Sequence, residues 1–423
     1  MGYVAVRGGG KAIEESLKLL EYQRVNASSA WGTDEIEGTF PELVDQVMGE
    51  ASLYAPRLAA LALKQAQGSP DEAVFLLRAF RSTLERPYVS RPVDTGAMRV
   101  NRRVSAAFKD VPGGQVLGAT RDYSHRLLAF DLETEGAEEL AEKRAELAAH
   151  FEKVAEALEA APDVAPGAPQ TPAALPRVLD YLRAQGLIAH VEADDAPPVD
   201  ATMAPLSFPA PRSVRLQTLA RGMTQAVEAL GYAAIRGFGP AHPTVGELRS
   251  GRVAVAVDHP LEAGGEQDAY YLGSVPVTEV ESVFESEGES DAGDGAATAT
   301  RSDGGGLSLA IGYGLVFGRA ETKAIAMSVL DHCLEHGDKR FPTEDEEFVL
   351  YHVDGVEATG FISHLKLPHY VTFQSKLSSV RGTRDDRGEH DPHGTRVAHD
   401  PQSTRDPHDQ PAESKEACDA AAL

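Results

Sequence analysis

The sequence predicts an α+β fold, with a helical N-terminal part and a C-terminal part that holds a mixed, largely antiparallel sheet. Apolar residues recur at helical spacing from the start of the chain to about residue 86. Apolar and polar residues alternate at 252–258 and again within 270–283, as they do in strands of an antiparallel sheet. The helical signals therefore gather in the first part of the chain and the strand signals in the second.

The same patterns divide the chain into four ranges. A stretch rich in proline and alanine at 162–176 marks a linker, and a second break rich in aspartate and proline follows it. The stretch 285–306 is acidic, rich in glycine and serine and without a hydrophobic face, so we expect a disordered loop. The predicted ranges are a mainly helical domain at 1–161, a linker or insertion at 162–211, an α+β domain at 212–380 and a disordered tail at 381–423.

Composition limits the classes of function. The chain has 423 residues and a net charge of -25, whereas a nucleic-acid-binding surface would be basic. No apolar run is long enough to span a bilayer and the N-terminus lacks an apolar signal core, so we expect a cytoplasmic protein. The two cysteines, Cys333 and Cys418, lie far apart in the sequence, which argues against a disulfide framework.

Two helices of the N-terminal part have clear boundaries. One is expected at about 11–25, after a short strand and three glycines. The other has the clearest start signal in the chain, with Ser69 as N-cap, Pro70 at the first helical position and Glu72 placed for a capping box. It is expected to end near residue 86. Its predicted buried face consists mainly of Phe75, Leu76, Phe80 and Leu84.

Residues 99–128 carry more polar chemistry than a connector needs. Several basic residues precede the turn sequence VPGGQ at 111–115, whose glycines allow the backbone to approach a ligand or a partner chain closely. Asp122 could orient His125, and Arg126 could bind a phosphate. We expect a subunit interface here rather than a catalytic site, and a buried polar network is the remaining alternative.

The C-terminal part is expected to open with a helix at 213–231 and to continue with a loop rich in glycine and proline. Polar groups that contact ligands often lie on such loops, held by a rigid scaffold. The polar residues of this loop are Arg236, His242, Glu247 and Arg249. Further along, the pattern predicts a helix at 321–334 and a strand at 348–353.

The segment after this strand holds two histidines, His364 and His369, five residues apart across Pro368. Neither a helix nor a strand brings side chains at that spacing together, but a turn at Leu367 and Pro368 could aim both rings at one point. Two convergent neutral imidazoles make half of a metal site, for zinc or another borderline transition metal. The alternative is a pair of half-buried histidines that flank a turn.

Sequence blocks in a fixed order resemble one known family across residues 3 to about 377. The longest block is DEEFVLYHVDGVEATGFISHLKLPHYV at 345–371. The others follow the family's order and are YVAVRGG and KAIEESL near the start, ALALKQA at 60–66, EAVFLLRAFRSTL at 72–84, KDVPGGQVLG at 109–118, DYSHRLL at 122–128, GELRSG at 246–251 and GYGLVFG at 312–318. On these blocks the chain resembles PhnI, a core subunit of the bacterial and archaeal carbon-phosphorus lyase complex.

The resemblance implies a reaction and partners. PhnI-like proteins act in phosphonate catabolism with the other core subunits of the lyase and with an ATP-binding-cassette-type partner. There a phosphonate such as methylphosphonate displaces adenine from C1′ of MgATP and gives ribose 1-phosphonate 5-triphosphate, which makes the subunit part of a transferase. Members in isolation act as nucleosidases. A different, cysteine-rich subunit carries the later radical step, and a chain with two cysteines agrees with that division.

Particular residues are candidates for this chemistry. His364 and His369 match the family's metal-binding histidines position by position. Displacement at C1′ passes through an oxocarbenium-like state, which needs an anchored triphosphate and a stabilised leaving base. The expected contacts for the anionic groups are Arg236, Arg249 and Lys366. The expected acid, base or supporting carboxylates are Glu346 and Glu347, next to Asp345. A solvated acidic run at the entrance of a strand explains these residues equally well.

Two other functions stay open at this point. The chain could be a non-catalytic scaffold subunit of the same complex, with the histidine pair as a structural metal clip, and it would then turn over no ATP in isolation. It could instead be an unrelated metallohydrolase, which predicts activity on simple phosphate esters without loss of adenine. The ordered family blocks argue against the metallohydrolase.

Overall fold

The computed structural model of the chain describes residues 9–26, 31–159, 175–188, 198–238, 242–261, 269–286, 308–367 and 369–388. The chain divides into two compact units, with Ala5–His364 in one and Leu365–Leu423 together with Met1–Val4 in the other. The larger unit contains the sheet and both main hydrophobic cores. None of the described helices is long and apolar enough to cross a membrane.

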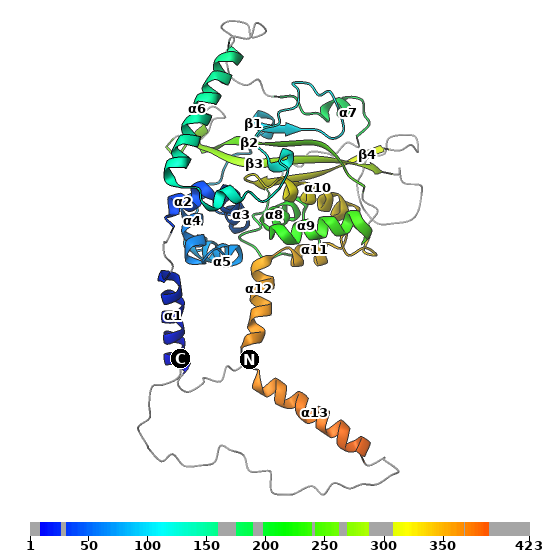
Figure 1. Ribbon diagram of the computed structural model, residues 1–423. Coiled ribbons are helices and arrows are strands. Elements are labelled where there is room, and N and C mark those ends of the chain that lie inside the picture. The colour runs from blue at the N-terminus through cyan, green and yellow to red at the C-terminus, as the bar shows by residue number, and fades with distance from the viewer. Residues whose placement is uncertain are drawn as a thin grey trace. The chain divides into compact units, whose positions relative to one another are not determined.

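Four strands form the sheet, in the order β1-β2-β3-β4 (Figure 1). Their bounds are Arg99–Val104 for β1, Thr244–Asp258 for β2, Ala269–Ser286 for β3 and Ser308–Phe317 for β4. The α+β class is confirmed, and every neighbouring pair of these strands is antiparallel. β1 comes from the predicted N-terminal domain and pairs with β2 of the predicted C-terminal domain. One sheet therefore joins the two ranges, and the division into domains stays a prediction.

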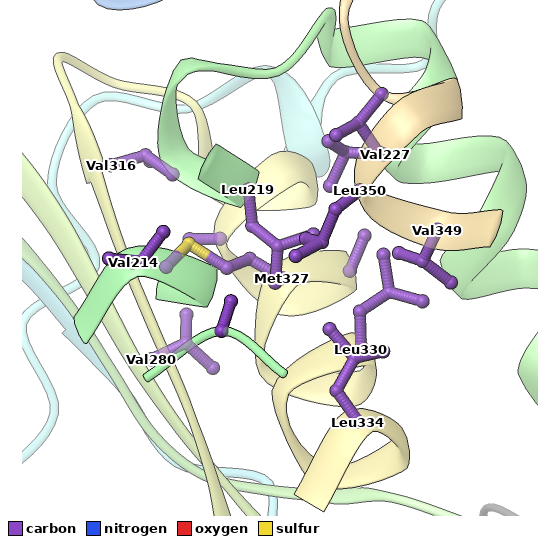
Figure 2. Packing of buried hydrophobic residues seen from close by; sticks show 14 of the residues in the cluster. Val214, Leu219, Val227, Val280, Val316, Met327, Leu330, Leu334, Val349 and Leu350 are labelled. Atoms are coloured by element: carbon purple, nitrogen blue, oxygen red, sulfur yellow. The ribbon is translucent and has the colours of Figure 1, made fainter. Parts of the chain in front are cut away.

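Helices cover one face of the sheet and build the larger core with it (Figure 1). These helices are α8 (Arg212–Arg221), α9 (Thr224–Ala233), α10 (Glu321–His336) and α11 (Glu346–His352). Figure 2 shows Met327 and Leu330 of α10 in the middle of this core, between Val280 of the sheet and Val349 of α11. The helix predicted at 321–334 is confirmed.

Glycines on β4 allow α10 to pack unusually close to the sheet. A Cβ atom on Gly312 would lie 2.0 Å from the carbonyl oxygen of Ser328, and one on Gly314 would lie 2.1 Å from that of Ala324. Both distances are far inside van der Waals contact, so only glycine fits while the helix keeps its place. The block GYGLVFG at 312–318 thus has a packing role.

The helix predicted at 213–231 is in fact two helices, because the chain turns at Gly222 between α8 and α9. A Cβ atom on Gly222 would lie 2.9 Å from the side chain of Val353. Nζ of the buried Lys323 on α10 donates to the carbonyl oxygens of Ala220 (2.8 Å) and Gly222 (2.7 Å). Burial lowers the pKa of this ammonium to about 8. Lys323 thereby ties the end of α8 to α10.

A second, smaller core lies among four helices that precede the sheet. They are α2 (Thr33–Thr39), α3 (Pro41–Ala51), α4 (Pro56–Gln65) and α5 (Pro70–Arg81). α5 begins as predicted, since Oγ of Ser69 accepts a hydrogen bond from the backbone N–H of Glu72. It ends at Arg81, five residues before the predicted end near residue 86.

The buried face of α5 was predicted wrongly except at Leu76, which is partly buried and packs against this core. Phe75 is 52% exposed, and Phe80 and Leu84 are exposed as well. The residues of α5 that reach the core are Ala73, Val74 and Leu77. The facing helix α4 contributes mainly alanines, so the helices pack closely through small side chains and leave the large ones outside. Side-chain size alone did not identify the core face.

The remaining elements are α1 (Gly9–Val25), α6 (Ala137–Glu159), α7 (Asp180–Ala184), α12 (Gly355–Ser363) and α13 (Tyr370–Gly388). α1 confirms the helix expected at 11–25, and none of its residues is buried. Short turns of other helix types are Thr95–Ala97, Arg121–Tyr123, Phe130–Glu133, Ala234–Phe238 and His364–Lys366.

Three predicted irregular stretches fall largely outside the described residues. β3 contains the first two residues of the loop expected at 285–306, and the rest of that loop is not described. Of the linker expected at 162–176, only residues 175 and 176 are described. α13 extends to Gly388, into the range expected to be a disordered tail, and 389–423 lie outside the described residues.

Candidate functional site

Glu346 and Glu347 lie in the first turn of α11 and not at the entrance of a strand. The prediction of a strand at 348–353 is therefore wrong. Oδ1 of Asp345 accepts a hydrogen bond from the backbone N–H of Phe348 at 3.0 Å and caps the helix. Val349 and the next residue then face the core. The cap and the acidic first turn stabilise a helix here, although the segment is rich in aromatic and β-branched residues.

The two glutamates have different surroundings. Oε1 of Glu346 accepts a hydrogen bond from the backbone N–H of Ala210 at 2.8 Å, so this carboxylate fixes α11 to the segment before α8. Glu347 has no hydrogen bond or ion pair with another described residue. It lines a shallow pocket of about 310 Å³ on the surface of α11. The lining residues are Asp345, Glu347, Phe348, Tyr351 and His352.

Aromatic rings define the wall of this pocket, which we call the α11 pocket. The rings of Phe348 and His352 stack with centroids 4.3 Å apart. The ring of Tyr351 meets that of Phe208 edge to face at 5.3 Å, which limits its movement. The α11 pocket thus joins two carboxylates to three ring side chains within one short helix.

An ion pair fixes the start of α12, the helix that carries His364 at its end. Oδ1 of Asp354 accepts hydrogen bonds from the backbone N–H groups of Val356 (3.0 Å) and Glu357 (3.2 Å) and caps the helix. Both carboxylate oxygens of Asp354 also accept from Nη1 of Arg78 on α5, at 2.8 and 2.9 Å. Burial would raise the pKa of Asp354, but the charge of Arg78 and the N–H donors lower it below its ordinary value.

The two predicted metal ligands lie in different units. His364 follows α12 at the end of the larger unit, with Nδ1 next to the carbonyl oxygen of Phe361. His369 belongs to the second unit, and its Nδ1 lies 2.6 Å from the carbonyl oxygen of Leu367. A carbonyl oxygen only accepts, so Nδ1 carries the proton in each neutral ring and Nε2 is the nitrogen suited to a metal.

That the two rings converge stays a prediction. Over the part of the chain that the structure describes, no three or more histidine, cysteine, aspartate or glutamate side chains are placed together to hold a metal ion. The donor set of the pair nevertheless suits zinc or a similar ion, because each ring is held in the tautomer that metal-binding histidines use. Two ligands leave positions for substrate, water or a group from another subunit.

Arg249 was predicted to bind anions from a loop, and its expected place on a loop is wrong. It lies within β2, its side chain is 1% exposed, and it forms an ion pair with the buried Glu279 on β3. Glu247, two residues earlier on the same face, pairs with the buried Arg103 at 2.6 Å. These charges stay in the interior because each is paired across neighbouring strands.

Glu279 is the centre of a polar network that the sequence did not reveal. Its Oε1 accepts hydrogen bonds from the hydroxyls of Thr95 (2.7 Å) and Tyr313 (2.8 Å) and from Arg177 (3.0 Å). Burial would raise the pKa of Glu279, but the charge of Arg249, these hydrogen bonds and Arg177 lower it. Burial and the neighbouring carboxylate raise the pKa of Tyr313. The network attaches the segment around Arg177 to the sheet.

The contacts of two arginines confirm part of the expectation for 99–128. Arg102 pairs with Glu321 (2.8 Å) and with Asp122 (3.0 Å), and Arg103 donates to the carbonyl oxygen of Pro112 in the VPGGQ turn. The alternative of a buried polar network therefore holds for Arg102 and Arg103. An interface role for the exposed remainder stays a prediction.

The other two predicted anion contacts are exposed. Arg236 lies in the turn Ala234–Phe238 that follows α9, and Lys366 lies in the turn His364–Lys366. Because Arg249 is buried in the sheet, the three basic side chains do not form one anion-binding group. Of these three residues, Arg236 and Lys366 are exposed.

Comparisons with known proteins agree with the ordered blocks. The family model described as bacterial phosphonate metabolism protein (PhnI) matches residues 2–387. Alpha-D-ribose 1-methylphosphonate 5-triphosphate synthase subunit PhnI of Escherichia coli (strain K12) is 41% identical over 91% of this chain and 99% of its own. The protein of the same description from Rhizobium meliloti (strain 1021) is 42% identical, over 92% and 96%. A putative C-P lyase subunit protein HtxH of Stutzerimonas stutzeri is 42% identical, over 91% and 96%. The chain belongs to the PhnI family of bacterial phosphonate metabolism proteins.

Proposed function

We propose that this chain is a subunit of a C-P lyase complex in phosphonate catabolism, and that it helps to exchange adenine for a phosphonate at C1′ of MgATP. Two relatives are named as subunits of a synthase whose product is a ribose with methylphosphonate at C1 and triphosphate at C5. ATP gives this product when its base is replaced, so adenine is the leaving group. With water in place of the phosphonate, the same chemistry is that of a nucleosidase.

The observation that carries the proposal is the state of the two histidines. His364 and His369 each have Nδ1 next to a backbone carbonyl oxygen, and Nε2 is then the nitrogen suited to zinc or a similar ion. A bound ion would act as a Lewis acid toward phosphate or phosphonate oxygens. Asp354 and Arg78 position His364 by fixing the start of α12.

The remaining roles follow from accessibility. Arg236 and Lys366 are exposed, and we assign them to the anionic groups of the substrates. Glu347 is accessible and has no described partner, so it replaces Glu346 as the carboxylate available to the reaction. Glu346 is assigned to holding α11 in place.

Partners are part of the proposal. Exposed apolar side chains such as Phe361 and Ile362 on α12 suit contacts with other C-P lyase core subunits and with an ATP-binding-cassette-type partner. The same surface favours the second candidate function, a scaffold subunit whose histidine pair is a structural metal clip. The net charge of -25 argues against a nucleic acid as partner, and we place the complex in the cytoplasm.

Release of adenine from MgATP tests the proposal. The purified chain is assayed alone and with the other core subunits and methylphosphonate, and adenine is separated by chromatography. The double variant His364→Ala with His369→Ala should assemble with its partners, lose bound metal and lose adenine release. His150→Ala with His259→Ala, which changes one histidine of α6 and one that follows β2, is the matched control and should keep both bound metal and adenine release.

The outcomes separate the two candidate functions. Adenine release that depends on the pair supports the exchange reaction. Equal release by wild type and double variant would remove the pair from the chemistry. No release in any combination, together with loss of partner binding in the double variant, would favour the scaffold.

A further inference from the structure

We propose that the outer side of β3 at residues 269–276, which we call the β3 edge, accepts an extended strand from a partner subunit. The added strand is apolar and brings one carboxylate to Arg252. This inference rests on the proposed function for the identity of the partner, which is another subunit of the C-P lyase complex. It adds a surface for strand pairing to the exposed side chains of α12.

The β3 edge exists because β3 is longer than its neighbour. β3 has 18 residues, whereas β4 has 10 and pairs only with residues 277–286. Residues 269–276 pair with β2 on one side, and no described strand pairs with them on the other. An unpaired side of a strand presents backbone N–H and C=O groups with which another extended chain can pair.

Two backbone hydrogen bonds show which groups point outward. The N–H of the residue after β4 donates to the carbonyl oxygen of Pro276 at 2.9 Å, and alternation along the strand turns the backbone groups of Ser274 the same way. The carbonyl oxygen of Ala256 accepts from the N–H of Arg91 at 2.8 Å and so points away from β3. The backbone groups of Tyr271, which lies opposite Ala256, therefore point away from β2. An added strand would accept from the N–H groups of Tyr271 and Ser274.

The side chains of the β3 edge are apolar and exposed. Charged residues make up 25% of the chain, yet residues 253–257 and 269–277 contain none. Tyr270, Tyr271 and Leu272 are 48%, 61% and 59% exposed. Pro276 and a bulge opposite Val255 and Ala256 limit the registers in which another strand can pair. The β3 edge therefore suits one matching apolar strand, and tyrosines are among the residues that contribute most to binding at interfaces.

Two arginines give the charge of the partner. Arg99 on β1 lies directly opposite Arg252 on β2, and like charges in that position repel. Nε of Arg252 donates to Oγ of Ser274 at 2.9 Å, and Nη2 donates to the carbonyl oxygen of the same residue. Neither arginine forms an ion pair with another described residue. A carboxylate on the added strand, next to Ser274, would neutralise Arg252 and relieve the repulsion.

A second copy of this chain is the competing occupant. Its own β3 edge would bring another Arg252 and no carboxylate, because the residues around that arginine in both strands are uncharged. The net charge of -25 on each copy also opposes self-association. The charges therefore favour a different protein as the partner.

Hydrogen exchange of backbone amides tests the pairing directly. The chain is measured alone and after assembly with the purified other core subunits. The N–H groups of Tyr271 and Ser274 should exchange about ten-fold more slowly in the assembly, because they gain acceptors. The N–H of Val275, which already points toward β2, should change much less.

Substitutions test the contribution of the β3 edge to affinity. Tyr271→Lys places a charge of the kind that guards natural strand edges, and should weaken binding to the other core subunits by about ten-fold. Tyr232→Lys on α9, at a tyrosine 64% exposed, is the matched control and should bind as wild type does. Arg252→Gln should weaken binding several-fold and make it less sensitive to salt. Thermal unfolding of each variant shows whether it is folded.

Each failure has its own signature. If the wild-type chain neither assembles with the core subunits nor releases adenine with them, the proposed function is wrong. If it assembles while Tyr271→Lys binds normally and the N–H groups of Tyr271 and Ser274 exchange as in the free chain, the β3 edge is not an interface and this inference is overturned. If the chain alone is a dimer that Tyr271→Lys converts to a monomer, the occupant is a second copy, which also overturns the inference. Slow exchange of both N–H groups in the monomeric chain would show that its own residues cover the edge, with the same consequence.

Discussion

Replacing Arg78 by methionine should destabilise the larger unit by about 3 kcal/mol. The Arg78 side chain is 13% exposed and its partner Asp354 is 21% exposed, so the pair is mostly shielded from water. Arg78 also donates to the carbonyl oxygens of Glu50 (3.0 Å) and Arg221 (3.2 Å). Breaking a buried pair costs about 3–5 kcal/mol, and the lower end applies because Asp354 keeps its two helix N–H donors.

Denaturant unfolding of the variants of a double-mutant cycle measures the coupling energy between Arg78 and Asp354. The partner variant is Asp354→Asn, since asparagine is as good an N-cap as aspartate and removes only the charge. Arg78→Met, Asp354→Asn and the double variant should give a coupling energy of about 2 kcal/mol. The exposed pair of Arg86 and Asp200, 48% and 41% exposed, is the control, and its coupling should stay below about 1 kcal/mol.

The pair also predicts a pH dependence. The pKa of Asp354 is lowered in the folded state, so its contribution is present above the unfolded pKa of about 3.9 and is lost as pH falls through the folded pKa. The difference in unfolding free energy between wild type and Arg78→Met should therefore shrink as the pH drops below about 4. A coupling energy below about 0.5 kcal/mol, or a difference that does not change with pH, would refute the reasoning.

Three further predictions concern packing, burial and capping. Lys323→Met removes an ammonium whose pKa is lowered from 10.5 to about 8 by burial, and a depressed lysine pKa destabilises the folded state at neutral pH. Wild type should therefore gain stability relative to this variant between pH 8 and pH 10.5, by up to about 3 kcal/mol in denaturant unfolding. If the unfolding free energies of the two proteins change with pH in parallel, the burial of the ammonium is contradicted. Gly314→Ala should cost about 1–3 kcal/mol because its Cβ would lie 2.1 Å from a carbonyl oxygen of α10, whereas Gly360→Ala, with open space around it, should not lower the melting temperature. Ser69→Ala should cost about 1 kcal/mol by removing the cap of α5, and Ser69→Asn should restore it, as thermal unfolding can show.

The sequence predicted those elements whose signals are local. Ser69 and Pro70 gave the start of α5, and the helical pattern gave α10, because capping and periodicity act within a few residues. α11 was missed for a physical reason. A seven-residue helix is too short to be stable by propensity, and its place is decided by the cap at Asp345 and by burial of Val349 against distant helices.

The residues of the candidate site could be named from the sequence, but their contacts could not. The histidine pair was proposed from spacing and resemblance, and it stays a prediction. Glu347 was one of two equal candidates. What separates Glu347 from Glu346 is a hydrogen bond to Ala210, which lies far away in the sequence. Arg249 was taken for a surface group because its partner Glu279 lies on the next strand, and a register between strands is set by the whole sheet.

The pairing of β1 with β2 has a consequence for synthesis of the chain. Residues 105–243 separate the two strands, and translation at about 5–20 residues per second needs on the order of ten seconds to make them. During that time β1 leaves the ribosome without the strand it will join. Arg99, Arg102 and Arg103 give β1 three positive charges, and charged side chains on an unpaired edge discourage association with other nascent chains. Arg102 and Arg103, which pair with carboxylates in the folded protein, thus also protect the strand before β2 is made.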